Sequence, residues 1–300
     1  MFHIYKGTKI PPVVKESAVD AVETFNFRDD DMLIATYPKS GTHWMNELVQ
    51  LLLHGGDPNK LGHSHRRTPM EITDVINVGR MDFAKAAVEL VEGDPSPRVL
   101  MTHLRPHHLP PQTWSKKIPI IYVLRNPMDL FLSLFEFYCG FTLPDGKPYM
   151  TKDNFDDTLR TFIAGEVAFD GWCDHVIQYE DVMQRNDNIM FVTYEEMKKD
   201  IQAVIKKVAK HIHRDVDDDV IVKVAANLTL EAMKLNYGKT METRKKLNLT
   251  EEPSPLHLFV RKGIAGRWKT EYPEAKWKEM RDTFKEMVKN TIYAKQYFEY

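Results

Sequence analysis

The sequence has few of the features that place a chain in a specialised class. Only two of its 300 residues are cysteine, Cys139 and Cys173, and these are too few and too isolated to predict a disulfide framework or a zinc site. No apolar run approaches the length of a membrane span, and residues 1–6 lack the apolar core of a signal peptide. We therefore expect a cytoplasmic protein with no membrane as its partner.

An excess of charge of one sign is also missing. The 41 Lys and Arg residues nearly balance the 43 Asp and Glu residues, which leaves a formal charge of −2. This balance gives no reason to expect a nucleic acid as partner, and any anion site has to be a local cluster of cations. The sequence has no cluster of metal ligands, no internal repeat and no strong linker. We therefore predict one domain over residues 1–300, without a metal.

Apolar runs alternate along the chain with stretches of helical periodicity. Strands are predicted at 32–36, 98–104, 119–124 and 188–194. Helices are predicted after the first strand to about Leu53, from Pro127, over 152–182, over 195–211, after the acidic run 217–219 and from about Pro273. Residues 1–30 are predicted to form an arm packed over the domain, and residues 236–260 a long loop. This alternation predicts an α/β fold with a central parallel sheet and helices on both faces.

The stretch Tyr37-Pro38-Lys39-Ser40-Gly41-Thr42-His43-Trp44 joins the first buried strand to its helix. Backbone N–H groups and the positive end of a helix dipole attract an anion there, and the hydroxyls and the ammonium add further donors. An ordinary turn capped by Ser or Thr is the plainer alternative. A Walker A loop, G-x-x-x-x-G-K-[ST], is excluded because no glycine precedes Lys39. The stretch predicts a phosphate-binding loop of another type.

Polar side chains lie at the end of the four predicted strands or shortly after it, namely Lys39, His103, Arg125 and Tyr194. Ligands bind beyond the carboxyl ends of parallel strands, so these residues predict a single site. Imidazole can accept a proton from a hydroxyl, which makes His103 a candidate base, although a lone histidine is often structural. Two weaker rivals lie beyond Pro106 in the following loop, His107 and His108.

Arg125 and Ser133 are eight residues apart and can face one phosphate from a strand end and the following helix. Their plainer roles are a surface ion pair and a hydroxyl bonded to its own helix. The run 261–263 suits a multiply charged phosphate, with a solvated basic patch as the alternative. Four aromatic residues are predicted to line an apolar acceptor pocket, although such residues are often plain core: Phe137, Phe141, Tyr149 and Phe169.

Several of these motifs together resemble the cytosolic sulfotransferases. The matching stretches are 37–42, 102–104, 125–133, 162–167, 194–198 and 261–269, which span nearly the whole chain in the family's order. The resemblance implies a P-loop-like α/β fold and an enzyme of EC 2.8.2 type. Such an enzyme moves a sulfuryl group from 3′-phosphoadenosine 5′-phosphosulfate (PAPS) to a hydroxyl or amine of a small hydrophobic acceptor, such as a phenol, sterol or alcohol. It also implies that no metal is required, and the missing dimer signature after Lys269 suits a monomer or a weak homodimer.

Carried onto this chain, the family pattern implies catalytic roles for His103 as the general base, for Lys39 at the leaving oxygen and for Ser133. The implied donor-binding residues are Lys39, Ser40, Gly41, Thr42, His43, Trp44, Arg125, Ser133, Tyr194, Thr229, Leu230, Phe259, Val260, Arg261, Lys262 and Gly263. Within this set, Trp44 would stack on the adenine, while Arg125, Ser133 and 261–263 would bind the 3′-phosphate.

The chain departs from the family pattern at His43, Met101, Leu230 and Arg267, where the family usually has Thr, Lys, Phe and Asp. Without the Phe, stacking on the adenine falls to Trp44 alone, at an expected cost of about 1 kcal/mol. These departures leave open a catalytically weakened, nucleotide-binding homologue. An ATP-dependent kinase is a third hypothesis, but it requires Walker glycines and an acidic Mg²⁺ ligand after a strand.

Overall fold

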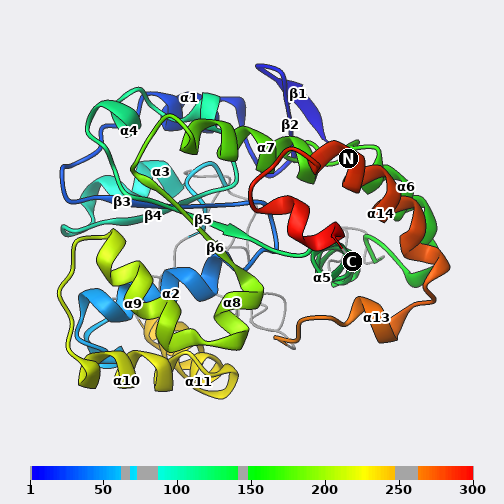
Figure 1. Cartoon of the computed structure of the whole chain (residues 1–300). Coiled ribbons are helices and arrows are strands. Elements are labelled where there is room, and N and C mark those ends of the chain that lie inside the picture. Colours follow the sequence, from blue (N-terminus) through cyan, green and yellow to red (C-terminus); the bar gives the residue numbers. More distant parts are fainter. Residues whose placement is uncertain (1, 62–67, 73–86, 141–147, 247–262, 300) are drawn as a thin grey trace.

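The computed structural model describes residues 2–61, 68–72, 87–140, 148–246 and 263–299 (Figure 1). Its central sheet has four parallel strands in the order β4-β3-β5-β6. Their bounds are Met32–Thr36 for β3, Val99–Thr102 for β4, Ile120–Leu124 for β5 and Ile189–Thr193 for β6. Every residue of β3 and β5 is buried, as expected for central strands that are covered on both faces.

Side chains that alternate along the strands divide the core into two layers. Ile34 and Ile121 pack on one side with helices α2, α9 and α10, whereas Leu33 and Tyr122 pack on the other with α1, α5 and α7. Figure 1 shows the first group of helices below the sheet and α1, α3, α4 and α7 above it. The prediction of a parallel α/β sheet with helices on both faces is confirmed.

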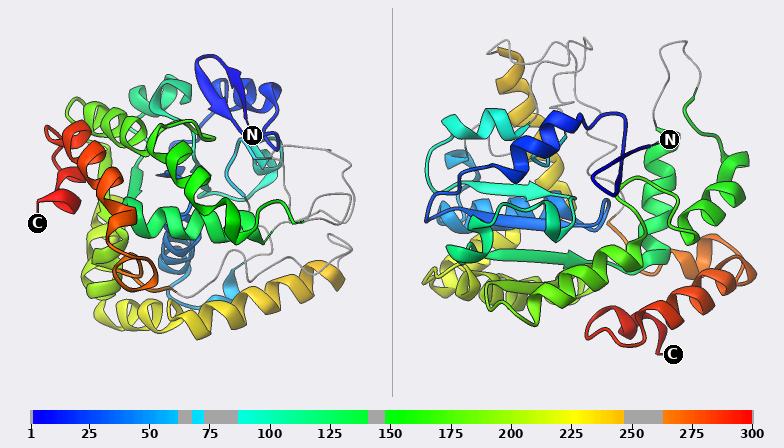
Figure 2. Two further views of the ribbon diagram at one scale, coloured as in Figure 1. Left: turned by 90° about the vertical axis from the view of Figure 1, so that its right-hand side faces the viewer. Right: turned by 90° about the horizontal axis from the view of Figure 1, so that it is seen from above.

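The helices of the lower layer are α2 (Thr42–Leu53), α8 (Tyr194–Lys199), α9 (Ile201–His211), α10 (Asp218–Asn227) and α11 (Leu230–Lys246). The remaining α-helices are α1 (Glu16–Glu23), α3 (Ala87–Leu90), α4 (Gln112–Ser115), α5 (Pro127–Cys139), α6 (Phe155–Ile163), α7 (Trp172–Met183), α13 (Trp268–Glu271) and α14 (Ala275–Val288). Short 3-10 turns are η1 (Pro58–Lys60), η3 (Val91–Gly93), η4 (Pro106–His108), η5 (Lys152–Asn154) and η6 (Ala294–Phe298). Figures 1 and 2 show α5, α6, α13 and α14 grouped beyond the carboxyl ends of the strands.

The predicted N-terminal arm contains an antiparallel hairpin, β1 (His3–Tyr5) with β2 (Thr8–Ile10), followed by α1. The hairpin is fastened to the domain by side chains, since Lys6 pairs with Asp20 and Glu23, and His108 also binds Glu23. The arm therefore packs on the domain as predicted.

Three predicted elements differ from the structure. The helix expected over 195–211 is two helices, because Asp200 leaves helical geometry and its carboxylate accepts from the N–H of Ala203 to start α9. The helical stretch expected over 152–182 is interrupted between α6 and α7. The prediction of a loop over 236–260 is wrong for residues 236–246, because α11 continues to Lys246. Residues 247–260 lie outside the described residues.

Candidate active site

The loop between β3 and α2 has the backbone of an anion cradle. Lys39 has a φ of 71° and Gly41 a φ of 113°, and Gly41 is the N-cap of α2. A Cβ atom on Gly41 would lie 3.0 Å from the Tyr194 ring and within reach of Val123, so the tight approach there requires glycine. The loop therefore turns the N–H groups at the start of α2 toward the end of the sheet.

Two buried donors at this loop have no hydrogen-bond partner within the described part of the chain, the Oγ of Ser40 and the Nε of Arg125. Arg125 is anchored by its Nη1, which donates to the Lys39 carbonyl over 2.9 Å, and its guanidinium lies 4.3 Å from the centre of the Tyr194 ring. The Trp44 ring also lies near Tyr194, at 5.3 Å between ring centres, and its Nε1 donates to the Leu228 carbonyl over 3.1 Å. Unpaired buried donors of this kind fit an anionic group.

His103 follows β4 and is held on three sides. Its backbone N–H donates to Oε1 of Glu71 over 2.8 Å, and its carbonyl accepts from Nε2 of His175 over 3.0 Å. The Nδ1 lies 2.8 Å from the Thr36 carbonyl, which can only accept, so this nitrogen carries the proton. The Nε2 is therefore the basic nitrogen of the neutral ring.

Burial controls the acidity of this group. It lowers the pKa of His103 to about 4, with a backbone hydrogen bond to Thr36 acting in the opposite direction and the charge of Lys39 adding to the decrease. Burial likewise raises the pKa of Glu71 to about 7, against hydrogen bonds from the His103 N–H and from the Thr102 hydroxyl, which lies 2.9 Å away. His103 is consequently uncharged at neutral pH.

Two of the predicted pocket aromatics lie beside these polar residues. The Nζ of Lys39 lies 4.0 Å from the centre of the Phe137 ring, and the Phe169 ring lies 5.5 Å from that of His103. Tyr149 instead contacts Tyr138, at 5.8 Å between ring centres. The fourth predicted aromatic, Phe141, lies outside the described residues.

Phe169 is presented by an unusual turn. Phe169 and Asp170 both have left-handed backbones, with φ values of 67° and 64°. The Phe169 N–H donates to the Lys9 carbonyl over 2.6 Å, and the Asp170 carboxylate accepts from the Lys9 N–H over 3.2 Å and pairs with Arg105 over 2.9 Å. The N-terminal hairpin thus holds the wall beside His103 in a conformation that L-residues rarely adopt.

The other predicted donor-binding residues that the structure describes mainly contact neighbouring protein groups. Thr229 is exposed and its hydroxyl accepts from the Ala232 N–H, while Leu230 packs near Trp44. The ring of His43 lies 6.4 Å from that of Tyr237. Ser133 is buried on α5, and Gly263 approaches Tyr194, since an added Cβ would lie 3.9 Å from its hydroxyl. Phe259, Val260, Arg261 and Lys262 lie outside the described residues.

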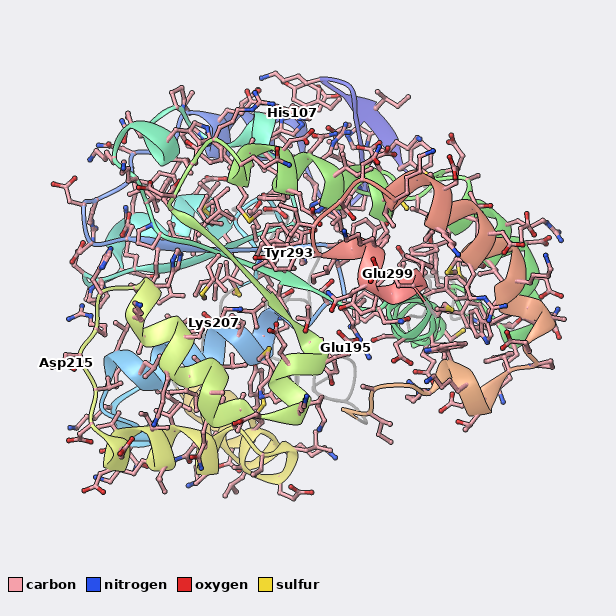
Figure 3. All side chains as sticks on the ribbon, viewed as in Figure 1. His107, Glu195, Lys207, Asp215, Tyr293 and Glu299 are labelled. Atoms are coloured by element: carbon pink, nitrogen blue, oxygen red, sulfur yellow. The ribbon has the colours of Figure 1, made fainter. Side chains whose placement is uncertain are left out.

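The structure also places the two alternative candidates for the base, His107 and His108, and Met101, which departs from the family pattern. His107 and His108 lie on η4 near the N-terminal hairpin, as Figure 3 shows for His107, and His108 binds Thr8 and Glu23. They are therefore engaged away from the loop of Lys39. Met101 is buried with Ile34 and Ile121 in the lower layer of the core, so this position is an apolar one.

Sequence reasoning missed three residues that hold His103, namely Thr36, Glu71 and His175. Thr36 acts through its carbonyl and its hydroxyl, which lie 2.8 and 3.0 Å from Nδ1 of His103, and no sequence pattern reveals this. Glu71 and His175 are separated from His103 by 32 and 72 residues, and neither belongs to a motif that names its partner.

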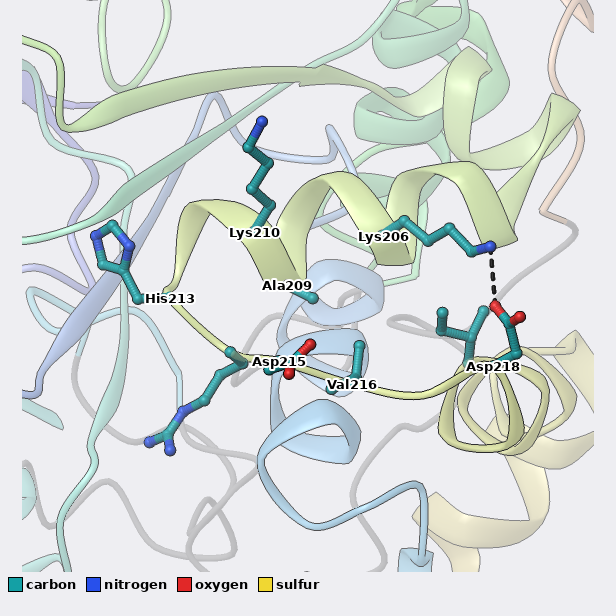
Figure 4. Close-up of a pocket in the computed structure, with 9 residues that line it drawn as sticks. Lys206, Ala209, Lys210, His213, Asp215, Val216 and Asp218 are labelled. Carbon is teal, nitrogen blue, oxygen red and sulfur yellow. Dashed lines mark ion pairs between the residues drawn. The ribbon is translucent and has the colours of Figure 1, made fainter.

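An open surface pocket of about 550 Å³ lies elsewhere, between the end of α9 and the start of α10 (Figure 4). Its lining includes Lys206, Lys210, His213 and Asp218, and Lys206 pairs with Asp218 over 3.0 Å. Nearby His211 binds the Ile120 carbonyl at the beginning of β5, so the pocket lies at the opposite end of the sheet from His103. Across the described ranges, no group of three or more His, Cys, Asp or Glu is arranged to hold a metal ion, and no helix is long and apolar enough to cross a membrane.

Comparisons with known proteins give the family. The model of the sulfotransferase domain matches residues 29–292. Sulfotransferase 1 family member D1 of Mus musculus is 32% identical over 274 residues, which cover 90% of this chain and 88% of the relative. Sulfotransferase 2B1 of Mus musculus is 33% identical over 288 residues, which cover 95% and 79%.

Solved structures agree with this assignment. The structure of mouse sulfotransferase SULT7A1 complexed with PAP has a TM-score of 0.78 at 27% identity, and the match covers 100% of this chain and 98% of that one. Retinol dehydratase, solved in complex with androsterone and the inactive cofactor PAP, shares the fold with a TM-score of 0.74 at 22% identity, over 95% and 88% of the two chains. The chain belongs to the sulfotransferase family, and is a transferase of the EC 2.8.2 type.

Proposed function

We propose that this protein transfers a sulfuryl group from PAPS to the hydroxyl, or amine, of a small hydrophobic acceptor such as a phenol, sterol or alcohol. The observation that carries the proposal is the convergence of a phosphate loop, a neutral buried histidine and a buried arginine at the carboxyl ends of adjacent strands. Lys39, His103 and Arg125 follow β3, β4 and β5 in this way.

The residues present fit the donor. Ser40 Oγ and Arg125 Nε are buried donors without partners in the described chain, beside the N-terminus of α2. Trp44 and Tyr194 offer aromatic surface next to them for a base. When bound, PAPS supplies the activated sulfuryl group and a nucleotide phosphate as leaving group. Lys39, Ser40, Gly41 and Thr42 would hold its 5′ end, and Arg125, Ser133 and Gly263 its 3′-phosphate.

His103 is proposed to accept the acceptor's proton. The Thr36 carbonyl fixes the proton on Nδ1, so Nε2 is the nitrogen that can receive another. Burial lowers the pKa of this ring to about 4, which keeps it neutral and ready to accept at pH 7. As the acceptor oxygen bonds to sulfur its proton becomes acidic, and a neutral imidazole then suffices.

Lys39 is proposed to stabilise charge on the leaving oxygen. Its ammonium lies over the Phe137 ring, which holds the cation in a partly apolar setting where its field is strong. A fixed cation that meets charge only as the bond breaks lowers the barrier more than it strengthens binding. The sulfuryl group carries less charge than a phosphoryl group, so the proposal includes no metal.

Apolar walls support the acceptor class. Phe137 lies beside Lys39, and Phe169 lies beside His103. A pocket with one polar base and aromatic walls suits a flat hydrophobic alcohol or phenol. We further propose that residues 1–300 act as one domain in the cytoplasm, as a monomer or a weak homodimer.

The experiment is a screen in which the protein, with sulfur-labelled PAPS, is offered phenols, sterols and aliphatic alcohols in the presence of EDTA. We expect labelled product from at least one class, its loss in His103→Ala, and unchanged affinity of that variant for adenosine 3′,5′-bisphosphate (PAP). Tight binding of PAP without turnover of any acceptor would overturn the proposal in favour of a nucleotide-binding homologue. Stabilisation by ATP with Mg²⁺ but not by PAP would favour a kinase.

A further inference from the structure

Arg267 lies at the centre of an ion-pair cluster beside α5. Its guanidinium donates to both carboxylate oxygens of Glu136, over 3.0 and 2.5 Å, and to both of Glu271, over 2.7 and 2.6 Å. The arginine side chain is only 6% exposed. We call Arg267, Glu136 and Glu271 the Arg267 cluster. It joins α5, which carries Glu136, to the segment Gly263–Glu271 that leads into and forms α13.

A second attachment fixes the backbone of the same segment. The carboxylate of Asp129, in the first turn of α5, accepts from the N–H of Gly266 over 2.5 Å and from that of Trp268 over 3.2 Å. The Trp268 carbonyl in turn accepts from Nε1 of Trp277 over 2.8 Å. Figure 2 shows α13 against α5, so both attachments act on one short stretch of chain.

Both elements that the cluster joins reach the candidate site. The helix α5 carries Ser133 and Phe137, and the segment begins at Gly263, which approaches the Tyr194 hydroxyl. Burial is the main cause that raises the pKa of Tyr194, and among the lesser causes Asp129 raises it and Arg267 lowers it. The charges of the two attachments therefore affect Tyr194, whose ring contacts both Arg125 and Trp44.

Energetics argue against a role in stability alone. A buried ion pair recovers little more than the cost of desolvating its charges, so apolar side chains of similar size would often stabilise a fold as well. What such a pair does supply is one defined register between two elements, since a shift of the segment would leave a buried guanidinium unpaired. Two carboxylates on one guanidinium restrict this register further. Each carboxylate must lie near the plane of the guanidinium to accept two hydrogen bonds from one of its edges.

We infer that Arg267 is a positioning residue for nucleotide binding: it fixes the segment Gly263–Trp268 on α5 in the register that keeps Gly263 beside Tyr194. The inference rests on the proposed function, because the nucleotide is the ligand whose affinity it controls. It assigns a purpose to a position at which this sequence differs from the usual family pattern, where an aspartate could not make the same pairs with Glu136 and Glu271.

The test compares Arg267→Met with a matched variant, Arg98→Met. Arg98 is also buried in a two-bond ion pair, with Asp31 at 2.8 and 2.5 Å, but lies at the start of β4, at the far end of the sheet. For each variant, the dissociation constant of PAP is measured by titration calorimetry, and Tm by thermal unfolding. We expect Arg267→Met to weaken PAP binding at least tenfold and to raise KM for the donor more than it lowers kcat. Arg98→Met is expected to lower Tm with PAP affinity within twofold of the wild type.

Two milder variants keep the test decisive if Arg267→Met does not fold. Glu136→Gln retains the shape of the cluster but removes the negative charge on one edge of the Arg267 guanidinium. It should weaken PAP binding severalfold. Arg267→Lys keeps the charge but cannot bridge both carboxylates, and should recover only part of the affinity. If folded variants at Arg267 and Glu136 all bind PAP like the wild type, the cluster is structural and the inference is wrong. If the wild type itself does not bind PAP, the proposed function fails first.

Discussion

The Nε2–H of His175 donates a hydrogen bond to the carbonyl oxygen of His103 over 3.0 Å. Because a carbonyl can only accept, Nε2 of His175 carries the proton, and its Nδ1 accepts from the Tyr122 hydroxyl over 2.8 Å. Both histidines are buried and burial is the main cause that lowers the pKa of each, to about 3 for His175 and about 4 for His103. A second neutral histidine thus anchors the backbone of the proposed base to the central strand.

We predict that His175→Leu slows sulfuryl transfer with little effect on nucleotide binding. The His103 carbonyl would lose its buried donor, at a cost of about 1–3 kcal/mol, and the freed backbone would misplace the ring. His175→Gln offers an amide N–H near the same place and should restore most of kcat. Steady-state kinetics and PAP titration of the three proteins provide the check. Equal kcat values for the Leu variant and the wild type would show that His175 has no positioning role.

The pH dependence of activity offers a second check. Since burial lowers the pKa of His103 to about 4, the neutral ring predominates at every pH above that value. The acidic limb of kcat/KM is therefore expected near pH 4 rather than near 6.5, provided the protein stays folded. The measurement is kcat/KM from pH 4 to pH 8 with a non-ionising alcohol. An acidic limb near 6.5 would contradict a desolvated base.

The lowered pKa of His103 also predicts how the free energy of unfolding changes with pH. Between pH 6.5 and about 4 the unfolded chain binds a proton at position 103 that the folded chain does not, so the free energy of unfolding falls as the pH falls through this window. Glu71 acts in the opposite sense, because burial raises its pKa to about 7. Urea unfolding of the wild type and His103→Asn, at several pH values, isolates the histidine. The Asn variant should lose less stability on acidification, and parallel curves would exclude the effect.

Gly41→Ala is predicted to weaken nucleotide binding by at least about tenfold. The new methyl group would lie 3.0 Å from the Tyr194 ring on a backbone with a φ of 113°, so the loop or the ring has to move. Gly55→Ala is the matched control, since Gly55 has a φ of 66° but open space around an added Cβ. Both variants should lose about 1–2 kcal/mol of stability from the left-handed backbone. Only the first should lose PAP affinity by titration, and equal losses would refute the argument.

Asp170→Ala is predicted to raise KM for the acceptor and to destabilise the fold by about 1–3 kcal/mol. It removes the ion pair with Arg105, the bond from the Lys9 N–H, and a residue type that tolerates the left-handed region. Asp170→Asn keeps the last two features and should stay closer to the wild type in KM. Kinetics with one acceptor at saturating donor, together with Tm, test this. An unchanged acceptor KM in the Ala variant would mean that the turn does not control the Phe169 wall.

Much of the architecture follows from local pattern. The central strands are apolar runs. His103, Arg125 and Tyr194 each follow a strand directly and Lys39 follows one within three residues, so the sheet and the end that carries the site could be predicted. Helix ends were harder to predict. Asp200 divides the stretch 195–211 because its backbone leaves helical geometry and its side chain caps α9. The surroundings of His103 could not be predicted at all. Glu71 and His175 reach it through tertiary packing, and neither a residue type nor a spacing in the sequence identifies such partners.

The N-terminal hairpin has a practical consequence for where a shortened form of this chain can be started. The family model starts at residue 29, so a boundary drawn from sequence similarity would discard Lys9 together with the strand that contains it. The sheet, the phosphate loop and the Arg267 cluster would all remain, yet the turn that presents Phe169 would lose its backbone partner. The same boundary would also remove α1, whose Ala18, Val19 and Val22 are buried in the upper layer of the core, so such a shortened chain should lose stability as well. Residues 3–10 thus help to hold the turn beside His103, although they lie outside the stretch that the family model matches.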